Sequence, residues 1–218
     1  MKVGIDGVLL GIWANTVNAA RILDIGTGTG LIALILAQRC TSIIDSIDIH
    51  PYAVKQAKEN IRLSPWPNRI NVEEISLQNY AESTACRYDL IVSNPPYFVN
   101  SLKAPDEDRA TARHTDTLTH EELIFNAMLL LAPSGKICII LPVVEAELCK
   151  KYALSKGLFC TCEVKVIPKP NAAVKRILME FRFLDIQNQV SELVVESTTR
   201  HQYSEEFILL AKDFYLRL

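Results

Sequence analysis

Short apolar runs alternate with helix-forming segments along most of the chain, and this alternation limits the fold more than any other feature. Five runs have the length and apolar content of buried strands: residues 21–25, 43–49, 69–75, 88–93 and 135–141. Helices are predicted at residues 31–39, 53–63, 119–131, 144–156 and, to close the chain, 202–218. Two final strands are predicted at residues 159–167 and 175–183, and because no helix separates them they should pair antiparallel. The pattern predicts one domain, residues 1–218, built on a doubly wound α/β sheet with an antiparallel edge.

The composition is that of a folded protein with a sizeable core. Apolar residues make up 49% of the chain and charged residues 22%, which argues against wholesale disorder. The net charge of −2 argues against a large nucleic-acid footprint, although it is compatible with a local basic patch. The sequence opens without a signal-peptide pattern, and no apolar stretch approaches the roughly 18 residues of a membrane span. We therefore expect a cytoplasmic protein that has no membrane partner.

The six cysteines form no CxxC pair. Cys160 and Cys162 have one residue between them, and two thiols at that spacing could ligate a metal, but no second pair of ligands stands nearby. We expect reduced core thiols and no metal site.

A glycine-rich turn follows the first strand. It contains Asp24, Gly26, Gly28 and Gly30. Glycines allow a tight turn and the close approach of a ligand, which should bind at the carboxyl end of the strand. A dinucleotide fingerprint would place its third glycine at position 31, where this chain has Leu31. A turn without a ligand is the plain alternative for this motif.

Carboxylates near the end of the second strand differ in their expected roles. Asp48 lies 22 residues after Gly26, at the strand's end, where its carboxylate could accept hydrogen bonds from two ribose hydroxyls. Asp45 lies within the strand, and its side chain should face away from Asp48. After the third strand, Ser76 and Leu77 are placed to meet an adenine ring, although an ordinary loop start explains them equally well.

The tetrapeptide Asn94-Pro95-Pro96-Tyr97 follows the fourth strand. Two prolines fix the backbone and remove two N–H donors, which leaves the carbonyls near Asn94 and Pro95 available as acceptors. The Asn94 amide adds an acceptor and Tyr97 adds a flat face. The motif therefore predicts a site for a planar ligand with an NH2 group, such as a nucleobase amine or a side-chain amide.

Polar and basic residues could contact a phosphate backbone. Residues 97–118 are polar and aperiodic, which predicts a long functional loop that includes Phe98 and Arg113. Phe98 could extend the stacking face or pack inside, and Arg113 could touch phosphate. The basic residues around the last two predicted strands form either a phosphate-binding edge or a solvated rim: Lys165, Lys169, Lys175 and Arg176.

Several segments together resemble one enzyme family. They are residues 1–13 (MKVGIDGVLLGIW), 23–31, 56–60, 64–66, 89–98, 112–113 and 214–216. Over nearly its whole length the chain is similar to the bacterial tRNA1(Val) (adenine-37-N6)-methyltransferases. The NPPY tetrapeptide is shared by several amino-methylating families, whereas the 1–13 segment is far more discriminating. In two respects the chain departs from the family: it has Ser76 where relatives usually have Asp, and a segment that usually precedes the MKVG stretch appears absent.

The resemblance implies a fold, a reaction and a set of roles. The fold would be the seven-stranded Rossmann-like sheet of class I methyltransferases, with the last strand antiparallel. The reaction would transfer a methyl group from S-adenosyl-L-methionine to N6 of adenine-37 in a tRNA, by a monomer. The implied catalytic residues are Asn94, Pro95 and Tyr97. The implied cofactor-binding residues are Asp6, Gly7, Asp24, Gly26, Gly28, Gly30, Asp48, Ser76, Leu77 and Asn94. The implied substrate-binding residues are Pro96, Phe98, Arg113, Lys175 and Arg176.

Other acceptors and another class of function stay open. The NPPY motif accommodates a glutamine side chain, as in a release factor, or guanine N2 in ribosomal RNA as readily as adenine. A non-catalytic RNA-binding scaffold would be a different class of protein, and a failure to bind the cofactor would identify it.

Overall fold

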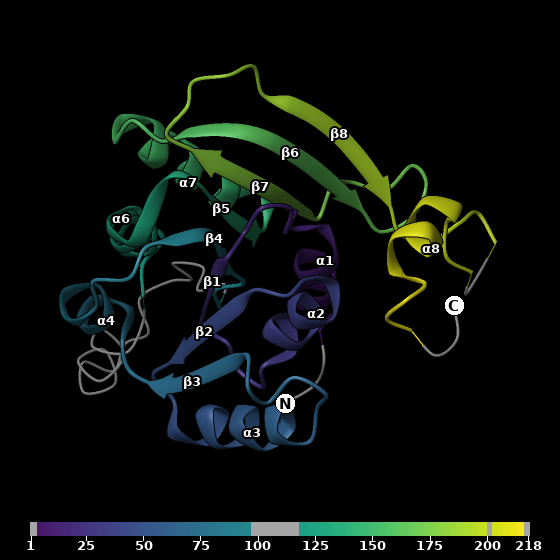
Figure 1. Cartoon of the computed structure of the whole chain (residues 1–218). Coiled ribbons are helices and arrows are strands. Elements are labelled where there is room, and N and C mark those ends of the chain that lie inside the picture. Colours follow the sequence, from purple (N-terminus) through teal and green to yellow (C-terminus); the bar gives the residue numbers. More distant parts are fainter. Residues whose placement is uncertain (1–3, 97–117, 200–201, 216–218) are drawn as a thin grey trace, which may run out of the picture.

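The computed structural model describes residues 4–96, 118–199 and 202–215, and its centre is one eight-stranded sheet (Figure 1). The strands are β1 (Arg21–Ile25), β2 (Ile43–Asp48), β3 (Ile70–Glu74), β4 (Tyr88–Ser93), β5 (Leu131–Leu141), β6 (Phe159–Ile167), β7 (Arg176–Arg182) and β8 (Gln189–Val194). Their spatial order is β3-β2-β1-β4-β5-β7-β6-β8. Strand β7 runs antiparallel to both β5 and β6, and the other strand pairs are parallel. The doubly wound sheet and the antiparallel pairing of the two late strands are thus confirmed.

Strand β8 was not predicted, so the sheet has eight strands where the resemblance implied seven. Its sequence, QVSELV, lacks a regular alternation of apolar and polar residues, and its first four residues are exposed. Pairing along β6, from Cys162 opposite Gln189 to Ile167 opposite Val194, defines this strand instead. Such pairing is a tertiary contact that periodicity does not report.

Helices cover both faces of the sheet (Figure 1). One face carries α1 (Ile5–Trp13), α2 (Leu31–Arg39), α3 (Pro51–Arg62) and α8 (Glu205–Ala211). The other carries α4 (Leu77–Ser83), α6 (His120–Leu130) and α7 (Val143–Ser155). Alternate strand residues feed the two layers: Ile22 packs with the first group and Leu23 with the second. Helices α1 and α4 were not predicted, and the closing helix is shorter than expected.

Local signals in the sequence explain several helix ends. Pro51 occupies the first turn of α3, where its missing N–H and fixed φ suit the helix. Helix α6 begins with a capping box: Glu122 N–H donates to the Thr119 hydroxyl, and Thr119 N–H donates to the Glu122 carboxylate at 2.9 Å. Ser76 and Ser204 cap α4 and α8 with their hydroxyls.

All six cysteines are free thiols, and burial raises the pKa of Cys149 to about 12, which makes that thiol unreactive. Within residues 4–96, 118–199 and 202–215, no helix has both the length and the apolar character needed to cross a membrane.

Candidate active site

The order of the strands reverses at β1, which lies between β2 and β4, and the candidate site lies at the carboxyl ends of these strands. The turn after β1 holds Gly26, Gly28 and Gly30 at φ values of +69°, +59° and +80°. All three lie in the left-handed region that L side chains rarely adopt, which is why glycine occurs at alternate positions. A Cβ atom at Gly26 would meet nothing within 4 Å, so the space beside this turn is open.

Backbone and side-chain hydrogen bonds hold the turn in place. Gly26 and Thr27 both donate from their backbone N–H to the Ile47 carbonyl of β2, at 2.9 and 3.0 Å. From α3, the Asn60 amide donates to the Thr29 carbonyl at 2.9 Å. The sequence analysis assigned no role to Thr27 or Asn60. The only sequence signal for Asn60 was its place in the 56–60 segment.

Asp24 is fully buried beneath the turn. The Thr27 hydroxyl donates to its Oδ2, while Oδ1 has no hydrogen-bond partner in the described part of the chain. Burial raises the pKa of Asp24 to about 7, against the opposing effects of the Thr27 hydroxyl and of the nearby Ala33 backbone N–H. A carboxyl group with an unmatched acceptor atom is therefore held at the predicted ligand edge.

Asp48 lies at the end of β2, as predicted, and is nearly fully buried. Its Oδ2 accepts from the Gly28 backbone N–H at 2.8 Å, and its Oδ1 accepts from the His50 N–H at 2.9 Å. A carboxylate has about four acceptor positions, so each oxygen keeps one for further donors. Asp48 thus stabilises the turn and retains the capacity to accept hydrogen bonds from hydroxyl groups.

Ser76 and Leu77 lie where the chain leaves β3, but local structure accounts for their side chains. The Ser76 hydroxyl accepts from the Asn79 N–H at 3.2 Å and caps α4. The Leu77 side chain is buried in the core with α6 and α7. A ligand at this edge would meet mainly the backbone of these two residues.

Asn94 follows β4 directly and is half-buried, Pro95 is buried and Pro96 is exposed. The neighbouring Ser93 hydroxyl donates to the Ile25 carbonyl at 3.0 Å, which ties the end of β4 to the glycine turn of β1. The structure therefore brings the tetrapeptide's first residue and the glycine turn to adjacent strand ends. Tyr97, Phe98 and Arg113 lie outside the described residues.

The first turn of α1 also reaches this site. A Cβ atom at Gly7 would lie 3.8 Å from the Asn94 amide nitrogen. The adjacent Asp6 accepts from Arg176 Nε at 2.9 Å. Arg176 begins β7 next to the carboxyl end of β5, where Leu141 pairs with Ile177. Asp6, Gly7 and Arg176 thus lie together at the candidate site, and Lys175 is exposed beside them.

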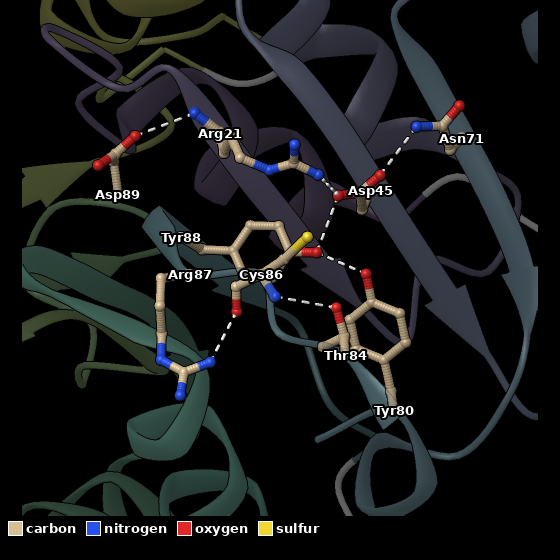
Figure 2. A network of polar contacts seen from close by, with 9 residues as sticks. All are labelled: Arg21, Asp45, Asn71, Tyr80, Thr84, Cys86, Arg87, Tyr88 and Asp89. Atoms are coloured by element: carbon tan, nitrogen blue, oxygen red, sulfur yellow. Dashed lines mark hydrogen bonds and ion pairs between the residues drawn. The ribbon is translucent and has the colours of Figure 1, made fainter. Parts of the chain in front are cut away.

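Asp45 belongs to a separate structural network, in agreement with its exclusion from the site (Figure 2). Its carboxylate accepts from Arg21 at 2.7 Å, from Tyr88 at 2.8 Å and from Asn71 at 2.9 Å. The Tyr80 and Tyr88 hydroxyls also bond to each other. Because Arg21 and Tyr88 begin their strands, this network lies toward the amino ends of the sheet, away from the glycine turn.

The three described ranges contain no group of three or more His, Cys, Asp or Glu side chains arranged to hold a metal ion.

Comparisons with known proteins agree on the family and the fold. Residues 7–166 match the family model described as "Methyltransferase small domain". The chain is 50% identical to the tRNA1(Val) (adenine(37)-N6)-methyltransferase of Parabacteroides distasonis, over all of this chain and 92% of that protein. It is 41% identical to the protein of the same name from Yersinia pestis, over 99% of this chain and 88% of that protein.

A solved structure of a predicted O-methyltransferase from Agrobacterium tumefaciens superposes with a TM-score of 0.74 at 17% identity, covering 95% of both chains. That likeness bears on the fold alone, and it agrees with the predicted class of sheet.

Proposed function

Since this chain belongs to the methyltransferase small-domain family and to the group of tRNA1(Val) (adenine(37)-N6)-methyltransferases, we propose that it methylates N6 of adenine-37 in a tRNA. The observation that carries the proposal is the junction of Asn94 with the glycine turn. The Ser93 hydroxyl joins the ends of β4 and β1, so a methyl acceptor at Asn94 would lie beside a donor at the turn. The printed names of the relatives supply the identity of the acceptor.

S-adenosyl-L-methionine is the proposed cofactor, and when bound it would supply an electrophilic methyl group. The residues fit such a group in three ways. The space at Gly26 is open, Asp24 has an unmatched acceptor oxygen, and Asp48 keeps acceptor positions for ribose hydroxyls. The remaining glycines, the backbone at Ser76 and Leu77, and the first turn of α1 at Asp6 and Gly7 would complete the site.

The acceptor nitrogen needs activation, because its lone pair is delocalised into the purine ring. In the proposal, its two N–H groups donate to the Asn94 side chain and to the Pro95 carbonyl. These bonds favour a tetrahedral nitrogen whose lone pair is no longer delocalised into the ring and points out of the ring plane toward the methyl donor. Pro96 cannot donate a hydrogen bond, so the strand end presents acceptors to the amine. Alignment supplies most of the rate increase. The methylated nitrogen would be cationic and acidic and would release its extra proton to water, so no strong general base is required.

The base must leave its stack to reach Asn94, as base-modifying enzymes require. We assign stacking to Tyr97, a contact worth about 1–3 kcal/mol, and we place Phe98 and Arg113 on the substrate side. Lys175 and Arg176 lie at the same edge of the sheet and carry positive charge. We propose that the exposed Lys175 faces the tRNA as well, whereas Arg176 donates to Asp6.

Labelled cofactor offered to the purified protein with tRNA, ribosomal RNA or release factor tests the acceptor. Label in the tRNA alone, mapped by nucleoside mass spectrometry to one N6-methyladenosine beside the anticodon, is the expected result. Label found only in protein or in ribosomal RNA would refute the assignment. A lack of cofactor binding in calorimetry would instead indicate a non-catalytic scaffold.

The role of Asn94 is tested by Asn94→Ala, which should lower kcat by about 100-fold or more because the amine is no longer aligned. Asn68→Ala is the matched control, since Asn68 is an exposed residue ahead of β3. Equal activities of the two variants would contradict the mechanism.

A further inference from the structure

Helix α1 is attached to the molecule at both of its ends. At its carboxyl end, Arg39 Nη1 donates to the Gly11 carbonyl at 2.6 Å and to the Ala14 carbonyl at 2.7 Å. At its amino end, Asp6 accepts from Arg176 Nε at 2.9 Å, across 170 positions of sequence. The side chains of Asp6 and Arg176 are only 17% and 28% exposed, so this ion pair is partly shielded from water.

Glycines bring α1 close to α2 and to the catalytic strand end. A Cβ atom at Gly11 would lie 3.0–3.2 Å from three atoms of the Ile35 side chain, so α1 and α2 pack more tightly there than most residues allow. One turn earlier, a Cβ atom at Gly7 would lie 3.4 Å from Leu31 and 3.8 Å from the Asn94 amide nitrogen. The first turn of α1 therefore lies directly beside the Asn94 side chain.

We propose that Arg176 is a positioning residue, which acts through Asp6 to hold the first turn of α1 against Asn94. The inference rests on the proposed function, because Asn94 is the residue that would bind the acceptor amine. Two donors of Arg176 are directed within the protein: Nε to Asp6, and Nη1 to the Lys175 carbonyl at 2.9 Å. Its contribution to the tRNA site is the placement of α1, while the exposed Lys175 provides the charge that faces phosphate.

A double-mutant cycle on Asp6→Asn and Arg176→Gln tests this assignment through kcat and cofactor affinity. If the ion pair acts as a unit, each single variant and the double variant lose activity by the same factor, about 10- to 100-fold. Arg176→Lys keeps a cation and should restore part of the loss. If Asp6 binds the cofactor and Arg176 binds tRNA independently, the losses multiply, and the proposal is overturned.

The salt dependence of tRNA binding separates positioning from phosphate contact. Lys175→Gln, the adjacent control, should reduce the slope of log K against log salt by about 1, while Arg176→Gln should leave it unchanged. A reduced slope in Arg176→Gln would overturn the proposal. Cofactor affinity is measured without RNA, so the double-mutant cycle can be completed even if tRNA is not the substrate. Failure of the positioning role is therefore distinguishable from failure of the proposed tRNA methylation.

Discussion

Asp24 makes the stability of the protein depend on pH in a way that one substitution should remove. Burial raises its pKa from an ordinary value of 3.8 to about 7. Below about pH 4 both the folded and the unfolded chain hold the proton, so ionisation of Asp24 contributes nothing to the free energy of unfolding. As the pH rises, the unfolded chain releases the proton first, so the folded state loses stability until its own carboxyl ionises near pH 7. Each pKa unit corresponds to about 1.4 kcal/mol, so the full cost is about 4 kcal/mol.

Urea unfolding of the wild type and of Asp24→Asn, measured from pH 4.5 to pH 8.5, gives the difference in unfolding free energy at each pH. We expect this difference to move in favour of the variant by a few kcal/mol as the pH rises to about 7 and to level off above that pH. Any pH-independent effect of the new amide on its neighbours shifts this difference equally at every pH and does not change its dependence on pH. Asp185→Asn, at an exposed position, measures the effect of removing one carboxylate from the surface. A pH-independent difference between the wild type and Asp24→Asn would refute the reasoning.

Four further substitutions test the buried network, the packing of α1 and the geometry of the glycine turn. Tyr88→Phe removes a buried hydroxyl that donates to Asp45, and should cost about 1–3 kcal/mol in urea unfolding while leaving cofactor affinity in calorimetry unchanged; undiminished stability would contradict this. Gly11→Ala should lower the thermal midpoint because overpacking against α2 outweighs a helix-propensity gain of about 1 kcal/mol. Gly7→Ala, which makes only ordinary contacts, should not lower it; equal midpoints for the two would argue against close packing at Gly11. Gly26→Ala should cost about 1–2 kcal/mol from φ alone, seen as a lower urea midpoint, since its Cβ meets no neighbour.

Elements with strong local signals were predictable from the sequence. The strands of residues 21–25 and 88–93 are short, mainly apolar segments, and the capping box at Thr119 marks the start of α6. Elements that depend on distant partners were not. Two glycines lower the helix propensity of α1, which forms because α2 and Arg39 stabilise it. Strand β8 forms because β6 offers an edge.

The candidate site likewise has features that could be predicted from the sequence and features that could not. The glycine spacing, Asp48 and the Asn94 tetrapeptide could be found from the sequence, because each follows a strand and parallel strands end at the same edge of a sheet. The sequence could not show that Asp48 already accepts from Gly28, or that Asp24 is buried enough to raise its pKa. Both facts depend on groups that are distant along the chain.

By itself, the sequence determined the fold class, the turn and the acceptor motif, because backbone sterics and apolar periodicity act over a few neighbouring residues. Tertiary structure alone decided that Arg176 pairs with Asp6 and that Gly7 lies beside Asn94. An ion pair across 170 positions leaves no local pattern, since its geometry depends on where helix α1 and strand β7 pack. The placement of α1 at the active site is therefore a property of the folded chain.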